Sequence, residues 1–421
     1  MGNRDEEAFA KTNGHRGSNH RVLIYSHDTY GLGHLRRSLL VAEGLAAEND
    51  APSVLIATGS PRAQAFDLPP GCDTVKLPAV TKASTGEYRP RTLGVGLEEL
   101  IEVRAEILRA VAQSFSPDLI LVDHSPVGMS GELWPLFDDL GSARDRPRMV
   151  LGLRDITDDA DAVQAEWARA GAWDAIERLY DRILVYGDPA LTTTAQDLGL
   201  TERFSDKVRL VGYLGRSIQT STAMNGQPNI VVTAGGGGDG HGLLSGYLSF
   251  LERLPARAAF RSTLVTGPFL SRGRQREIRE RCRALDQPVE VVSFTNRFEE
   301  LLSSAAGVVS MAGYNTVVEI LATGVPALLV PRVVPRREQL VRARRLAALD
   351  GDSLVVTDGP NPDRIGEFVE RVIGGTIHRR KGSPVQMDGL SRTVAELREM
   401  LGTPGARLSG KRRSKRVAAL A

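Results

Sequence analysis

Three loops in the sequence combine glycine with polar side chains that could bind or react with a ligand. The first, residues 30–37, reads YGLGHLRR and follows a short apolar run. Its glycines, Gly31 and Gly33, would let the backbone approach a ligand closely. His34 would stand at the start of the next helix, where it could act as a general base, with Arg36 beside it. A tight turn with a capping histidine is the structural alternative.

A nicotinamide-dinucleotide site is not supported by this loop. That motif needs a third glycine where Arg36 stands, and an acidic residue at the end of the second strand, which is missing.

The second loop, residues 234–242, reads AGGGGDGHG after an apolar run. Backbone N–H groups around Gly235 and Gly236 could face a phosphate. The loop lacks the Lys-Ser/Thr pair of a P-loop, so it does not indicate nucleotide hydrolysis of that kind. A flexible turn is the alternative reading.

The third segment, residues 310–319, reads SMAGYNTVVE and carries the most specific pattern. Gly313 to Thr316 would open a helix, whose N-terminus suits a diphosphate. Glu319 would lie about one turn further on, on the same face as Asn315 and Thr316. A carboxylate there could accept hydrogen bonds from a vicinal diol such as a ribose. A glutamate inside an apolar helix is unfavourable without a partner, which favours a functional role.

Polar residues also follow two strands of the first half, at residues 123–128 and 154–156. We expect Asp123 and Asp155 to be catalytic carboxylates that face His34 across a cleft. His124 and Arg154 would line the same cleft. Capping and loop roles are the alternatives for both segments. No metal is expected, because the remaining histidines show no ligand spacing.

Apolar runs alternate with amphipathic helical segments along the chain, which predicts an α/β protein. Continuous apolar strands are typical of parallel sheets covered on both faces, so we expect two Rossmann-like, doubly wound lobes facing across a cleft. The expected organisation is a disordered leader (1–20), a first lobe (21–215), a linker (216–228), a second lobe (229–389), a terminal helix (390–401) and a basic disordered tail (402–421).

Composition narrows the function classes. The 421 residues include 5% aromatics and two cysteines, and the net charge is +2. Six basic residues lie in the tail, so the rest of the chain is mildly acidic, which argues against nucleic acid as a partner. The polar N-terminus has no apolar signal segment, and two distant cysteines form no disulfide framework, so a cytoplasmic location is expected. The tail is either a solvated segment or a contact to the anionic inner face of a membrane.

The two lobes, the G-x-G-H loop and the pattern A-G-x-x-T-x-x-E…G-x-P…P…Q together resemble the GT-B glycosyltransferases, and among them the MurG-like family. The resemblance covers roughly residues 21–350. It implies transfer of a sugar from a UDP-linked donor to an acceptor hydroxyl, with the first lobe as the acceptor lobe and the second as the nucleotide-sugar lobe. The acceptor would be lipid-linked or a small molecule. The resemblance also implies metal independence, and no cofactor, since the nucleotide sugar is a substrate.

The resemblance assigns donor-site roles residue by residue. Gly313 and Thr316 would hold the diphosphate, Glu319 the ribose and Gln339, next to Glu338, a sugar hydroxyl. The segment 292–295, with Phe294 and Thr295, resembles the one whose backbone reads the nucleobase.

Two departures from the family pattern keep other functions open. Arg342-Ala343 follows Gln339 where the family has Asn-Ala, and the first loop carries Arg36-Arg37. The first loop also resembles the nucleotide-sugar hydrolase of pseudaminic acid synthesis. A hydrolase or epimerase on the same scaffold, or a non-catalytic nucleotide-sugar sensor, are therefore the alternatives.

Overall fold

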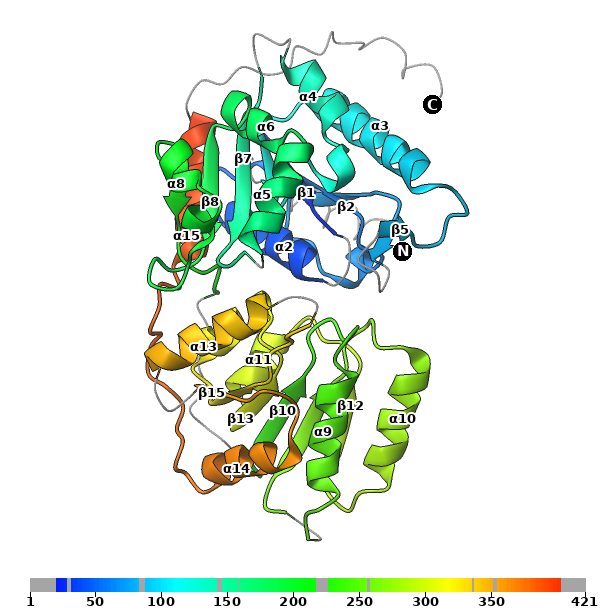
Figure 1. The fold of residues 1–421 in the computed structure, drawn as a ribbon, viewed down its shortest axis with the longest axis vertical. Helices are drawn as coiled ribbons and strands as arrows, with labels where there is room; N and C mark the ends of the chain where they lie inside the picture. Colours follow the sequence, from blue (N-terminus) through cyan, green and yellow to red (C-terminus); the bar gives the residue numbers. More distant parts are fainter. Residues whose placement is uncertain are drawn as a thin grey trace, which may run out of the picture.

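The computed structural model contains two α/β lobes, one above the other in Figure 1, each with helices packed on a parallel sheet. The two-lobed α/β prediction is therefore confirmed. The described residues are 20–28, 32–82, 88–141, 146–157, 159–216, 226–255, 258–334, 337–350 and 354–402. Gly31, most of the expected linker, nearly all of the leader and the tail beyond residue 402 lie outside them.

The first lobe is built on a parallel sheet in which β1 lies between β2 and β6, in the order β3-β2-β1-β6-β7-β8-β9. β1 and β6 are almost completely buried, as their unbroken apolar sequences predict. The strands are β1 (Arg21–Ser26), β2 (Ser53–Thr58), β3 (Cys72–Lys76), β6 (Leu119–Asp123), β7 (Arg148–Arg154), β8 (Arg182–Tyr186) and β9 (Val208–Leu210).

Helices cover this sheet, and a small antiparallel hairpin stands beside it. The helices are α2 (Gly33–Ala46), α3 (Leu97–Phe115), α4 (Trp134–Gly141), α5 (Ala160–Arg169), α6 (Ala172–Arg178), α7 (Thr194–Asp197) and α8 (Leu200–Arg203). The hairpin pairs β4 (Val80–Lys82) with β5 (Tyr88–Pro90).

The second lobe repeats the design, with the order β12-β11-β10-β13-β14-β15. Its strands are β10 (Asn229–Thr233), β11 (Arg261–Val265), β12 (Val289–Val292), β13 (Gly307–Ser310), β14 (Ala327–Leu329) and β15 (Leu354–Val356). Its helices are α9 (His241–Leu251), α10 (Arg272–Arg283), α11 (Phe298–Ser303), α12 (Tyr314–Thr323), α13 (Glu338–Asp350) and α14 (Pro362–Ile373).

The terminal helix α15 (Gly389–Gly402) returns to the first lobe, where Figure 1 shows it beside β8. It packs on α2 at Gly44, where an added Cβ would lie 2.7 Å from a methyl group of Val394. α15 thus supports α2, the helix that carries His34. Among the described helices, none is both long and apolar enough to cross a membrane.

The structure differs from the sequence prediction in several elements. The sequence pattern predicts one helix over residues 162–180, but α5 and α6 are separate helices, because Gly171 adopts a positive φ of 72° between them. β3, the hairpin, β15 and α14 were not predicted. β3 is only partly buried, so it lacks the continuous apolar pattern that identifies the central strands.

Candidate functional site

A cleft of about 1230 Å³, counted to its solvent mouth, lies between the two lobes. The start of α2 forms one wall, and the loop after β10 with the start of α12 forms the other. Ligands of doubly wound proteins bind at these carboxyl ends of parallel strands. The expected site residues that line the cleft are Gly33, His34, Arg36, Arg154, Gly235, Gly236, Phe294, Thr295, Gly313, Asn315, Thr316, Glu338 and Gln339.

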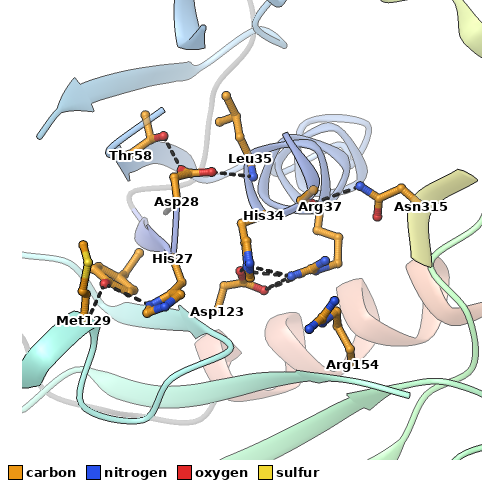
Figure 2. A network of polar contacts seen from close by, with 12 residues as sticks. His27, Asp28, His34, Leu35, Arg37, Thr58, Asp123, Met129, Arg154 and Asn315 are labelled. Atoms are coloured by element: carbon orange, nitrogen blue, oxygen red, sulfur yellow. Dashed lines mark hydrogen bonds and ion pairs between the residues drawn. The ribbon is translucent and has the colours of Figure 1, made fainter. Parts of the chain in front are cut away.

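His34 and Asp123 form a dyad at the first wall (Figure 2). His34 Nδ1 lies 2.5 Å from Asp123 Oδ2, because the parallel pairing of β1 with β6 brings their carboxyl ends together. With the Nδ1 proton directed at the carboxylate, Nε2 keeps its lone pair and can accept a proton. The arrangement therefore suits a general base oriented by a carboxylate.

Arg37 is a member of this site that the sequence did not single out. Its side chain is buried, and Nε and Nη2 donate to Asp123 Oδ1 over 3.3 and 3.0 Å. Burial raises the pKa of Asp123, but Arg37 and His34 outweigh that effect and hold this pKa well below its usual range. Asp123 thus stays ionised beside His34. The one available signal was the position of Arg37, one helical turn after His34.

Two more histidines surround the dyad. The rings of His27 and His124 lie 5.6 and 5.2 Å from the ring of His34, centroid to centroid. Burial lowers the pKa of His27 to about 3 and that of His124 well below its usual value, so both stay neutral. His124, at a positive φ of 74°, is not among the residues that line the cleft. His124 therefore packs against His34, whereas the sequence predicted that it would line the cleft.

Asp155 is not part of the cleft. Its carboxylate is completely buried and accepts two hydrogen bonds of 2.8 Å from Arg342 of α13 and one of 2.9 Å from Tyr213. Both carboxylate oxygens are thereby engaged in joining the lobes. We correct the expected catalytic role accordingly, and the same contact explains why arginine follows Gln339 where the MurG-like pattern has asparagine.

The second wall presents backbone rather than side chains. Gly237 has a φ of 86°, and a Cβ there would lie 2.2 Å from the carbonyl oxygen of Thr266. The loop after β10 can therefore lie directly on the loop after β11 only with glycine here. Beside it on the same wall, Gly313 caps α12 in an extended conformation without a side-chain cap. The N–H groups of the first turn of α12 thus offer a site for an anion.

Glu319 meets the first lobe instead of standing open. Its carboxylate accepts a hydrogen bond from Arg36 of α2, and it lines a neighbouring cavity of about 900 Å³ rather than the cleft itself. Burial raises the pKa of Glu319 to about 7, although Arg36 acts in the opposite direction. Asn315, one turn earlier, donates to the carbonyl of Gly33 over 3.1 Å. The two helices that line the cleft therefore contact each other directly.

The remaining expected residues also join the lobes or orient one another. Arg154 pairs with Glu338 at 3.0 Å, and Gln339 accepts a hydrogen bond from the backbone N–H of Arg332. Phe294 packs edge-on against Phe66 of the first lobe, with 5.5 Å between ring centroids. In the parts of the chain that the structure describes, no group of three or more His, Cys, Asp or Glu side chains could hold a metal ion.

Known proteins are similar to this chain in sequence and in fold. Residues 260–373 match the model of the glycosyltransferase family 28 C-terminal domain. The UDP-N-acetylglucosamine--N-acetylmuramyl-(pentapeptide) pyrophosphoryl-undecaprenol N-acetylglucosamine transferase of Brucella anthropi is 33% identical over 96 residues. These residues are 22% of this chain and 25% of that relative, so the match spans a quarter of its length.

Two solved structures are similar over nearly their whole length. The calicheamicin glycosyltransferase CalG4 has a TM-score of 0.56 at 16% identity, over 91% of this chain and 99% of that protein. The UDP-GlcNAc 2-epimerase of Methanocaldococcus jannaschii has a TM-score of 0.55 at 9% identity, over 90% and 99%. Such low identities show the fold alone. Residues 260–373 thus match the glycosyltransferase family 28 C-terminal domain, and the chain as a whole has the GT-B fold.

Proposed function

We propose that this protein transfers a hexosyl group from a UDP-sugar to an acceptor hydroxyl. The observation that carries the proposal is the cleft itself, which sets the His34–Asp123 dyad opposite the open start of α12. A base on one wall and an anion site on the other are the two parts that such a transfer requires. The match of the second lobe to family 28 and the name of the Brucella relative support UDP as the nucleotide.

The reaction follows from these positions. Nε2 of His34 takes the proton of the acceptor hydroxyl, and the oxygen attacks the anomeric carbon of the sugar. The bond from that carbon to the diphosphate oxygen breaks, and UDP leaves with the electron pair. Asp123 stabilises the imidazolium that forms, as the carboxylate does in other His-carboxylate pairs. Backbone N–H groups at Gly235 and at the start of α12 stabilise the charge on the leaving diphosphate.

Two finer points belong to the same proposal. The diphosphate charge is met by helix and loop N–H groups, so activity should survive a chelator. The acceptor is a hydroxyl compound, either small or lipid-linked. The basic tail outside the described residues would favour a lipid-linked acceptor by attraction to an anionic membrane.

Incubation with a panel of UDP-sugars, with and without candidate acceptors, tests this function. We expect slow UDP release alone and faster release with formation of a glycosylated product when a suitable acceptor is present. Rapid release without any acceptor would identify a hydrolase, and conversion of one UDP-sugar into another would identify an epimerase. Binding without any turnover across the panel would indicate a sensor.

A further inference from the structure

An ion-pair network with unequal charges crosses the 900 Å³ cavity between α2 and α12. Arg216 pairs with Glu43 at 2.6 Å and with Glu299 at 2.9 Å, and Arg36 pairs with Glu319. The network therefore holds three carboxylates against two guanidinium groups. The lining of the cavity as a whole has four arginines and four acidic residues, so its preference for a ligand depends on individual unpaired atoms rather than on net charge.

Glu319 is the carboxylate of this network that has one oxygen without a partner. The residue is 8% exposed, and its Oε1 accepts from Arg36. Its Oε2 is buried and has no hydrogen-bond partner among the described residues. A buried carboxylate oxygen without a donor is unfavourable, so a ligand that supplies a donor to this oxygen gains affinity.

Arg36 could stay on Glu319 when a nucleotide binds, or it could be displaced. The pair lies largely out of solvent, with side-chain exposures of 25% for Arg36 and 10% for Glu319. Removing one partner of such a pair leaves a charge without compensation, which is strongly unfavourable. Oε2 is free without any movement of Arg36, so retention of the pair requires no such loss.

We propose that Arg36 of the first lobe completes the nucleotide subsite: it holds Oε1 of Glu319 and leaves Oε2 to accept one hydroxyl of the ribose. The proposal rests on the proposed function, since it takes the ligand to be a nucleoside diphosphate. Arg36 is a specificity-determining residue in this account, because one free oxygen recognises one hydroxyl rather than a diol.

Calorimetric titration with UDP, 2′-deoxy-UDP and 3′-deoxy-UDP tests the proposal. The proteins compared are the wild type, Arg36→Gln, Arg36→Lys and the control Arg276→Gln. Arg276 lies on α10, lines neither the cleft nor this cavity, is 77% exposed and pairs with Glu280. Wild type should lose about 10–100-fold in affinity with one deoxy analogue and little with the other.

Arg36→Gln should bind UDP at least tenfold more weakly and discriminate less between UDP and that analogue. Arg36→Lys, which keeps the charge, should recover part of both effects, and Arg276→Gln should behave as wild type. Equal or tighter UDP binding by Arg36→Gln would overturn the proposal, as would equal losses with both analogues. If wild type binds no nucleoside diphosphate at all, the proposed function fails, and this inference fails with it.

Discussion

His34 is the side chain on which the proposed chemistry depends. His34→Ala should lower turnover by on the order of 10²–10⁴-fold, the usual contribution of a general base. Donor affinity should change little, because the proposed donor contacts come from the second lobe and from Arg36 and not from His34. Steady-state kinetics with calorimetry of UDP binding measure both quantities, and the exposed His378→Ala is a matched control. Undiminished turnover would reduce His34 to a turn residue, and a large loss of donor affinity would make it a phosphate ligand.

Glu319 should make donor binding depend on pH. Its pKa of about 7 arises from burial, with Glu299 acting in the same direction and Arg36 and Arg216 opposing it. The carboxyl is therefore mostly protonated at pH 6 and mostly ionised at pH 8, where it is the better acceptor for a hydroxyl. UDP affinity should rise across this interval.

The control for this prediction is Glu319→Gln, which cannot ionise. The variant should bind UDP more weakly by about 1.5–3 kcal/mol at pH 8, the scale of a charged hydrogen bond. Any rise in affinity that UDP itself causes by titration should persist in the variant. Identical pH profiles for the two proteins would contradict the role of Glu319.

The close packing of the loop after β10 can be tested by substitution at Gly237. Gly237→Ala places a methyl group against the carbonyl of Thr266 and strains a positive φ, so it should destabilise the protein by about 1–3 kcal/mol and weaken UDP binding. Gly242→Ala, in the first turn of α9 with open space around it, should be neutral or stabilising. Thermal unfolding and calorimetry separate the two. Equal effects would contradict the close loop packing.

The alternation of strands and helices could be predicted from the sequence, and so could the loops at the ends of the strands. Continuous apolar strands such as β1 and β10 identify parallel sheets, and the carboxyl ends of these strands must carry the site. The contacts between lobes were not predictable. Arg36 and Glu319 are 283 positions apart, and nothing local to either marks the other as its partner. The function of Asp155 was misjudged for the same reason, because its partner Arg342 lies on a helix of the other lobe.

The joint between the lobes is a property of the whole molecule. Asp155 and Arg342 are both completely buried, so Asp155→Asn leaves an uncompensated guanidinium and should destabilise the protein by about 3–5 kcal/mol. Adding Arg342→Met should restore part of the loss. The exposed pair of Arg364 and Glu367 provides the comparison, since Arg364→Gln should change stability by less than about 1 kcal/mol. An unchanged unfolding midpoint in Asp155→Asn would contradict this role.

A crystal structure of the protein with a bound UDP-sugar tests the central claim most directly. We expect the diphosphate to lie within hydrogen-bond distance of the N–H groups at the start of α12 and at Gly235. The ribose should lie at Glu319, and the anomeric carbon should face Nε2 of His34. A UDP-sugar bound away from both the cleft and the adjoining cavity at Glu319, or with its anomeric carbon turned away from His34, would show that the proposed arrangement is wrong.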